Sequence, residues 1–304
     1  MNDTALPPPP AARVLHEGGP DISQVAWGMW RFAGAGHADA RACVDAALDA
    51  GITLFDTADI YGLDTPAGFG AAEVLLGELF AEDRALRDRM VLASKGGIVP
   101  GVPYDSSPAY LRRAVDASLH RLGVDRLDLW QVHRPDILTH PQELARTLEE
   151  MVASGKVGAV GVSNFTLAQM EALVALSDIP IATSQPELSV LHRQPIEDGQ
   201  LDRAMACGRV VLAWSPLAGG RLVSPDTSEA QAAASALDAV AREHGVSRAT
   251  AAFSWVAHHP AHPVPIIGSQ NPERIRDGAD IGAVGWTRRS WYDVLQAAMG
   301  EALP

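Results

Sequence analysis

The chain has 304 residues, of which 47% are hydrophobic and 20% are charged, and its formal net charge is -13 at pH 7. This composition is typical of a soluble globular protein, and the strong negative charge argues against nucleic acids and anionic membranes as partners. No apolar run approaches the roughly 20 residues that a membrane-spanning helix needs.

The N-terminus has neither the basic start nor the apolar core of a signal peptide, and four prolines follow it almost at once, at 7–10. The two cysteines, Cys43 and Cys207, lie in helix-like segments and make no disulfide scaffold, so a reduced, cytoplasmic setting is expected. Residues 1–12 are predicted to form a flexible tail, and residues 13–304 a single domain.

Strand-like apolar stretches alternate with helical periodicity along the rest of the chain. After a predicted hairpin over 13–23, we expect strands at 25–30, 52–57, 90–94, 127–132, 157–162, 181–184, 210–214 and 264–267. Helices are expected at 37–50, 71–80, from 107, from 141, and at 166–176, 229–244, 247–258, 272–278 and 287–299. Eight alternations favour an α/β fold, a parallel sheet closed into a (β/α)8 TIM barrel, which usually needs about 250 residues.

Polar side chains stand at the ends of several predicted strands. Asp56 and Tyr61 follow the second strand, Lys95 the third, His133 the fourth, and Ser163-Asn164 the fifth. Parallel barrel strands point their carboxyl ends at one mouth, so these groups can converge there. Taken singly, each has an ordinary structural explanation, and only their combination favours catalysis. Asp59, beside them, is expected to have a structural role.

Six stretches, in order and at matching spacing, resemble the aldo-keto reductases, in particular the bacterial NAD(P)H-dependent oxidoreductases. They are F-D-T-A-D-I-Y-G at 55–62, A-S-K-G-G at 93–97, L-W-Q-V-H-R-P-D at 129–136, G-V-S-N-F at 161–165, A-W-S-P-L-A-G-G-R-L at 213–222 and P-I-I-G-S-Q-N-P-E-R-I at 265–275. The resemblance implies a barrel whose bottom is crossed by the N-terminal β-hairpin, and reversible reduction of an aldehyde or ketone to an alcohol, an EC 1.1.1 type of reaction.

The resemblance also implies four catalytic roles. Tyr61 is the proton donor, Lys95 tunes it, Asp56 anchors the lysine, and His133 orients the carbonyl. A free tyrosine has a pKa of about 10, and a nearby ammonium is expected to lower that value by stabilising the phenolate.

Cofactor contacts are carried over in the same way. Ser163, Asn164 and Gln185 are expected to hold the nicotinamide carboxamide, Trp214 to stack on its ring, and the glycine-containing loop after it to approach the pyrophosphate. The complete predicted set is Gly28, Met29, Trp30, Ser163, Asn164, Gln185, Trp214, Ser215, Leu217, Gly219, Gly220, Arg221, Gly268, Ser269, Gln270, Asn271 and Arg274.

NADP(H) is favoured as the cofactor, with NAD(H) as the open alternative. Asn271 and Pro272 are good residues with which to begin a helix, whose N-terminus attracts phosphate, and Arg274 could bind a 2′-phosphate. Against this, NADP-preferring relatives usually carry Lys or Arg near Gln270 or Asn271, and this chain has neither there.

The substrate is predicted only as a small-molecule carbonyl compound with an apolar portion. The candidate apolar walls are Trp30, Phe32, Phe69, Tyr104 and Leu191, and Arg134 is expected to form a surface salt bridge or to touch a polar substrate. No metal-ligand spacing is found, and the oligomeric state cannot be predicted. The alternatives are a cofactor-binding regulatory or scaffold protein of the same fold and an unrelated barrel hydrolase or lyase.

Overall fold

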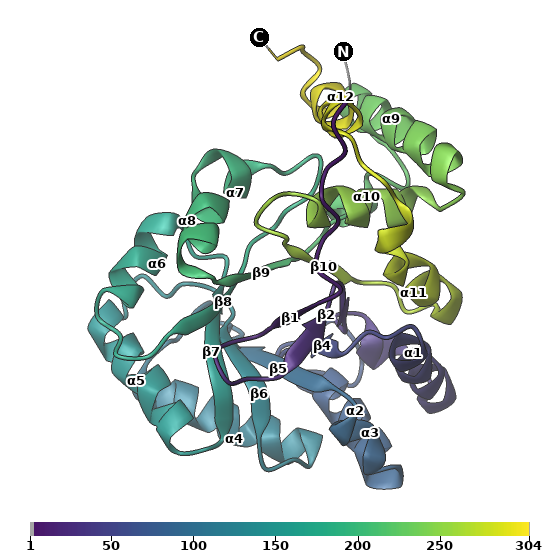
Figure 1. The fold of residues 1–304 in the computed structure, drawn as a ribbon. Helices are drawn as coiled ribbons and strands as arrows, with labels where there is room; N and C mark the ends of the chain where they lie inside the picture. The colour runs from purple at the N-terminus through teal and green to yellow at the C-terminus, as the bar shows by residue number, and fades with distance from the viewer. Residues whose placement is uncertain (1–2, 304) are drawn as a thin grey trace.

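The computed structural model describes residues 3–303 and shows eight parallel strands closed into a barrel (Figure 1). The strands follow one another around the barrel in chain order, and the last pairs with the first. They are β3 (Ala26–Gly28), β4 (Leu54–Asp56), β5 (Val91–Gly96), β6 (Leu127–Val132), β7 (Val157–Ser163), β8 (Ile181–Gln185), β9 (Val210–Ala213) and β10 (Val264–Ile267). The predicted (β/α)8 barrel is confirmed.

Helices surround the barrel on its outer face (Figure 1). Those that follow the barrel strands are α1 (His37–Asp49), α2 (Ala71–Glu82), α4 (Pro108–Leu122), α5 (Pro141–Ala153), α6 (Leu167–Val174), α8 (Gln200–Cys207), α10 (Arg248–Ala257) and α11 (Pro272–Ala279). Three helices were not predicted from the sequence: α8 and the two short helices α3 (Ala85–Asp88) and α7 (Gln194–Glu197). Gly199 and Gly208, both in the left-handed conformation, flank α8 and are its local signal.

Two further helices, α9 (Ser228–His244) and α12 (Arg288–Met299), pack against each other at one side of the barrel (Figure 1). Their apolar faces share a second core with α10. Leu237 of α9, Trp255 of α10 and Trp291 of α12 belong to this core, and the two indoles stack 4.4 Å apart. These helices therefore extend the hydrophobic core beyond the barrel wall.

The N-terminal hairpin closes the bottom of the barrel, as predicted. Its strands are β1 (Ala12–Val14) and β2 (Asp21–Ser23), and they lie in front of the barrel in Figure 1. Leu15 and Ile22 are buried in one cluster with inward-facing side chains of the barrel strands. Arg13 donates to the carbonyl of His262, just before β10, and Ser23 bonds Thr53, just before β4. Both contacts lie just before the strands, so the hairpin covers the end of the barrel opposite the carboxyl ends of the strands.

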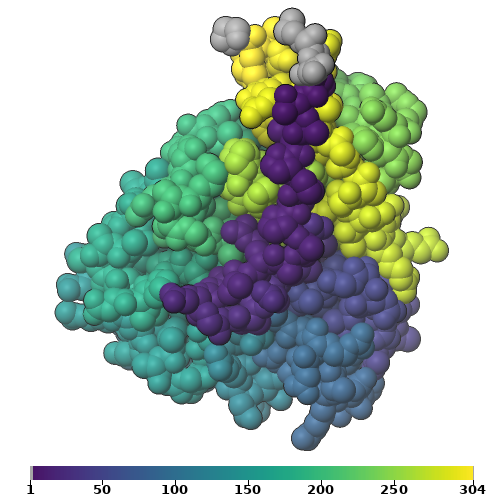
Figure 2. Space-filling view, viewed as in Figure 1, coloured from purple at the N-terminus to yellow at the C-terminus, as the bar shows by residue number. Residues whose placement is uncertain are grey.

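The segment before the hairpin runs over the surface from α12 to the barrel (Figure 2). The backbone of Leu6 donates to Trp286, the backbone of Arg288 donates to Thr4, and the carbonyl of Pro9 accepts from Gln24. Residues 1 and 2 lie outside the described part of the chain. The mobility of residues 1–12 stays a prediction, and these are the bonds that such motion would break.

Within residues 3–303, no helix combines the length and the apolar character that crossing a membrane requires.

We expect Leu15→Ala to lower the free energy of unfolding by about 2–5 kcal/mol, because it leaves a cavity beneath the barrel floor. The neighbouring Val14 is 51% exposed, so Val14→Ala should change stability by no more than about 0.5 kcal/mol. Urea unfolding of both variants measures the difference. Equal, small effects would contradict a sealing role for the hairpin.

Candidate active site

Three of the predicted catalytic side chains stand at the ends of neighbouring strands. Asp56 is the last residue of β4, Lys95 is the last but one of β5, and His133 directly follows β6. These strands pair with one another in the barrel. Because all of them point the same way, their side chains meet at one mouth.

Alternation along β5 explains why Lys95 points inward. Ser94 faces the helix layer, where its hydroxyl donates to the carboxylate of Glu73 on α2. Successive side chains of a strand point to opposite faces, so Ala93 and Lys95 face the barrel interior. Ala93 accordingly belongs to the interior cluster that the hairpin closes.

Lys95 is fully buried, and its ammonium donates three hydrogen bonds. The acceptors are Asp56 Oδ2 at 2.7 Å, the carbonyl of Thr57 at 2.8 Å and the Tyr61 hydroxyl at 3.1 Å. An ammonium has three N–H groups, so its donor capacity is fully used. The structure thus joins three of the four predicted catalytic residues through one nitrogen.

Backbone hydrogen bonds position Tyr61 over this ammonium. The Asp59 amide donates to the Lys95 carbonyl, which ties the turn after β4 to β5. Tyr61 donates to Ala58 within the turn, and its own carbonyl accepts from Ala72 at the start of α2. The turn therefore brings the phenol back to the strand ends.

Asp56 is held by two side-chain amides that face the barrel interior. Its Oδ1 accepts from Gln131 at 3.3 Å and from Gln185 at 3.1 Å, and Gln131 in turn accepts from Thr183. Gln131 was not predicted as a site residue from the sequence. Its signal was a polar residue on the same face of β6 as Leu129, which lies in the interior cluster. These amides orient the carboxylate that receives Lys95.

The environment sets the protonation states of Tyr61 and Lys95. Burial raises the pKa of Tyr61 above 10, and the attraction of Lys95 only partly opposes this. Burial also lowers the pKa of Lys95, but Asp56 and Tyr61 more than offset it, so the pKa ends above 10.5. Lys95 thus lowers the pKa of Tyr61 as expected, but the desolvation of the phenolate raises this pKa by more, so the net shift is upward. At neutral pH the phenol keeps its proton.

His133 is a neutral imidazole beside the phenol. Burial, followed by the positive charges of Lys95 and Arg134, lowers its pKa well below 6.5. Its ring lies edge-on to Tyr61, with the two centroids 5.8 Å apart. A neutral imidazole retains one N–H, with which it can donate to a carbonyl oxygen.

The predicted carboxamide-binding residues form a hydrogen-bonded chain next to the predicted catalytic residues. The Ser163 hydroxyl donates to the Gln185 carbonyl at 2.9 Å, and the Asn164 amide donates to Ser163 at 2.8 Å and to the carbonyl of His133 at 3.1 Å. The indole of Trp214 donates to Asn164 Oδ1 at 2.9 Å. Asn164 has a positive φ of 61°, which asparagine tolerates better than most residues.

The loop after β9 exposes backbone. Ser215, Gly219 and Gly220 all have positive φ, and a Cβ at either glycine would meet nothing within 4 Å. The Gly219 amide donates to the hydroxyl of Ser215 at 2.7 Å. This open loop fits the close approach of a pyrophosphate, for which glycines are suited.

The start of α11 supports an anion-binding site. Asn271 caps the helix by accepting from the amide of Arg274, Pro272 is its first residue, and the Ser269 hydroxyl accepts from Asn271. Gly268 borders open space. Arg274 is exposed, and no carboxylate within the described part of the chain lies within 4 Å of it.

Other predicted cofactor residues have structural partners. The side chain of Met29 is fully buried in the core, Leu217 packs against that core, and Arg221 forms an ion pair with Asp226 at 2.9 Å. Each therefore has a structural use that the sequence did not reveal.

The remaining three members of the predicted set lie near the first barrel strand. Gln270 donates to the carbonyl of Gly28 at 3.0 Å, and Trp30 is 60% exposed just beyond β3. They complete one side of the mouth.

The predicted apolar walls do not all line the mouth. Phe32 is fully buried edge-on against Trp27, and Leu191 packs on the second core. Phe69 lies beneath the guanidinium of Arg121. Phe32 is therefore part of the core.

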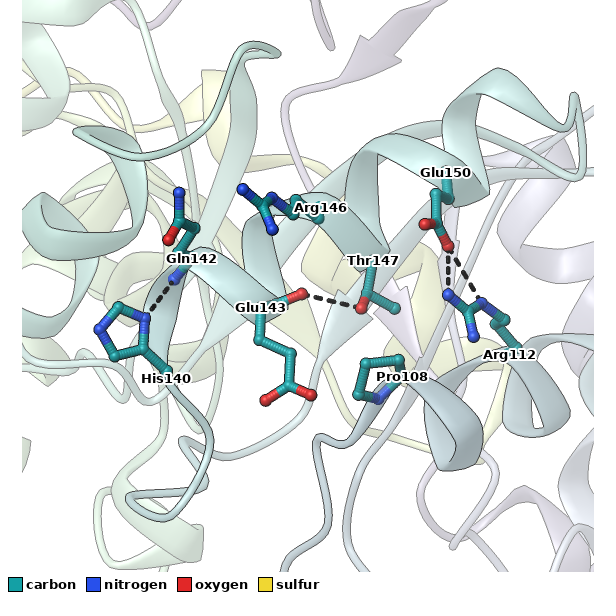
Figure 3. A pocket seen from close by; sticks show the side chains of 8 residues that line it. All are labelled: Pro108, Arg112, His140, Gln142, Glu143, Arg146, Thr147 and Glu150. Carbon is teal, nitrogen blue, oxygen red and sulfur yellow. Dashed lines mark hydrogen bonds and ion pairs between the residues drawn. The ribbon is translucent and has the colours of Figure 1, made fainter.

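A surface groove of about 370 Å³ lies elsewhere, between α4 and α5 (Figure 3). Arg112 bonds Glu150 in it, and Thr147 bonds the backbone of Glu143. It lies on the outer side of two barrel helices and includes none of the predicted site residues. No group of three or more metal-ligating side chains occurs among residues 3–303.

Comparison with known proteins agrees with the fold. Residues 24–293 match the aldo/keto reductase family. A 6-dehydroglucose reductase of Novosphingobium aromaticivorans is 58% identical over 98% of this chain and 99% of its own length. A second protein of that name, from Agrobacterium fabrum, is 36% identical over 92% of this chain and 96% of its own.

A solved structure shares the architecture. It is a thermostable aldo-keto reductase in complex with the inhibitor epalrestat, superimposable with a TM-score of 0.80 over 94% of this chain and 99% of its own. At 22% sequence identity, the likeness concerns the fold alone.

Asp59 provides a pH test of the buried surroundings. It is buried, neither carboxyl oxygen has a hydrogen-bond partner among residues 3–303, and burial followed by repulsion from Glu73 raises its pKa well above 3.8. A carboxyl whose pKa is raised in the folded state makes its full contribution to stability below its unfolded pKa of about 3.9. This contribution is lost as the pH rises through the folded-state pKa. The amide of the Asp59→Asn variant cannot titrate. The free energy of unfolding of this variant should therefore rise relative to that of the wild type by up to about 1.4 kcal/mol per pH unit above pH 4.

Urea unfolding between pH 4 and 8 measures this difference. Asp64→Asn, at an exposed loop position, is the control. If the difference in the free energy of unfolding between Asp59→Asn and wild type does not change with pH, Asp59 is ionised in the folded protein.

Proposed function

Since the chain belongs to the aldo/keto reductase family, we propose that it reduces an aldehyde to an alcohol with NADPH, and that Tyr61 donates the proton. The observation that carries this proposal is the Lys95 ammonium, bonded at once to Asp56 and to the Tyr61 hydroxyl. A buried lysine used only for stability would not need a phenol as its third partner.

The residues fit a nicotinamide nucleotide. The exposed backbone after β9, the capped start of α11 and the unpaired Arg274 suit its phosphates, and the Trp214–Asn164 pair suits the nicotinamide. When bound, the cofactor supplies a hydride to the carbonyl carbon.

The protein supplies the proton and the orientation. Tyr61 gives its phenolic proton to the carbonyl oxygen as that oxygen gains negative charge, and the Lys95 ammonium stabilises the phenolate left behind. His133, being neutral, donates a hydrogen bond that aligns the same oxygen. The products are an alcohol and the oxidised cofactor.

The two relatives suggest the substrate. Both are named for the reduction of 6-dehydroglucose, and one is 58% identical over nearly the whole chain. We therefore propose an aldehyde at C6 of a hexose as substrate and glucose as product, in place of a carbonyl compound with an apolar portion.

Tyr61→Phe should lower kcat for 6-dehydroglucose by at least about a hundredfold, because it removes the proton donor. The affinity for NADPH should stay within about twofold of wild type. Tyr292→Phe is the control, since this tyrosine is partly exposed on α12. NADPH oxidation in the steady state and fluorescence titration of NADPH give the two readouts.

The outcomes of this experiment separate the alternatives. Near-normal turnover by Tyr61→Phe would refute the proton-donor role. Tight NADPH binding by the wild type with no turnover on any carbonyl compound would favour a regulatory protein.

Arg274→Ala should weaken NADPH binding about tenfold or more and leave NADH binding unchanged. Arg274 is exposed and has no acidic partner among residues 3–303, so its charge would pair with the 2′-phosphate. Arg289→Ala, at a highly exposed position on α12, is the matched control. Equal weakening of both nucleotides would show that Arg274 does not distinguish them.

A further inference from the structure

Arg134 is a cation at the barrel mouth without an acidic partner. It follows His133, whose amide donates to the Gly96 carbonyl at the end of β5. Among residues 3–303, no carboxylate lies within 4 Å of its guanidinium, and no hydrogen bond from it is found. Arg121 and Arg248, by contrast, each bond a carboxylate. The surface salt bridge considered for Arg134 from the sequence therefore does not form within the described part of the chain.

Aromatic packing holds this guanidinium. It lies 5.8 Å from the ring centroid of Trp214, a distance at which a cation is attracted to an aromatic face. Trp214 is itself fixed by its hydrogen bond to Asn164. The Arg134 side chain is only partly exposed, so part of its ordering cost is met before any ligand binds.

The positive charge of Arg134 acts on both His133 and Tyr61. After burial and Lys95, Arg134 is the next cause of the low pKa of His133, and it also slightly opposes the rise in the pKa of Tyr61. A substrate whose carbonyl lies between Tyr61 and His133 would therefore present its adjoining atoms to Arg134.

The chemistry of the side chain indicates what those atoms are. A guanidinium has five N–H donors in a planar fork and no acceptor, so it needs a ligand rich in oxygen acceptors. Neighbouring hydroxyl groups of a sugar offer two acceptors at a spacing that such a fork can reach. An apolar aldehyde offers none and would leave the donors unpaired.

We propose that Arg134 is a specificity-determining residue, which donates hydrogen bonds to the hydroxyl groups of a polyhydroxylated aldehyde while its carbonyl meets Tyr61 and His133. This inference rests on the proposed carbonyl reduction. It favours a hydroxyl-rich substrate over apolar aldehydes.

The test compares Arg134→Leu and Arg134→Lys with wild type on three aldehydes: 6-dehydroglucose, benzaldehyde and succinate semialdehyde. For 6-dehydroglucose, Arg134→Leu should lower kcat/KM at least about tenfold, chiefly through KM, and Arg134→Lys should recover part of the loss. Benzaldehyde turnover and NADPH affinity should stay within about threefold. Arg112→Leu, in the outer groove of Figure 3, is the control.

Three results would overturn the proposal. An equal loss on 6-dehydroglucose and benzaldehyde would mean that Arg134 acts on the proton donor, and weaker NADPH binding would assign it to the cofactor. A wild-type preference for succinate semialdehyde that Arg134→Leu abolishes would make it a carboxylate site.

The experiment also separates this inference from the proposed function. If the wild type reduces none of the aldehydes, the proposed function fails. Calorimetric titration of glucose, the proposed product, into the NADP⁺ complex then decides the role of Arg134. Weaker glucose binding by Arg134→Leu supports the inference, and equal or absent binding in both proteins overturns it.

Discussion

The ion pair between Lys95 and Asp56 is the interaction on which the rest of the site depends. Two opposite charges are buried beneath the barrel mouth, where desolvation is costly unless every hydrogen-bonding group has a partner. Lys95 uses all three donors, and Asp56 accepts from Gln131 and Gln185 on two further strands. Losing one member would leave a buried charge unpaired, at a cost of about 3–5 kcal/mol.

This pair also helps to set different protonation states in neighbouring side chains. Lys95 stays charged because Asp56 compensates for its burial, and its charge helps keep His133 neutral. The Tyr61 phenol stays protonated because burial outweighs the ammonium. An acid that holds its proton beside a neutral imidazole suits reduction, in which the carbonyl oxygen gains negative charge and needs a donor.

Hydrogen bonds around the ion pair link it to the proposed cofactor and substrate contacts. Gln185 bonds Asp56 through its side chain and accepts from Ser163 through its backbone, so the proposed catalytic residues and the proposed nicotinamide contacts share one network. Trp214 extends this network to Arg134 at the mouth. The proposed reaction and the proposed substrate contact therefore depend on the same strand ends. Loops can vary around them while the strands keep their register.

The sequence by itself determined the barrel, the closing hairpin and the identity of the strand-end residues, because strand periodicity and motif order are local properties of the chain. Only the tertiary structure decided how these groups titrate and which are free to bind. The direction of the pKa shift of Tyr61 depends on burial by distant elements. Within residues 3–303, Arg134 has no acidic partner because of where the carboxylates lie. Met29 and Phe32 are buried in the core. Packing between elements that are far apart in sequence decides which apolar side chains are covered, and the sequence alone does not show it.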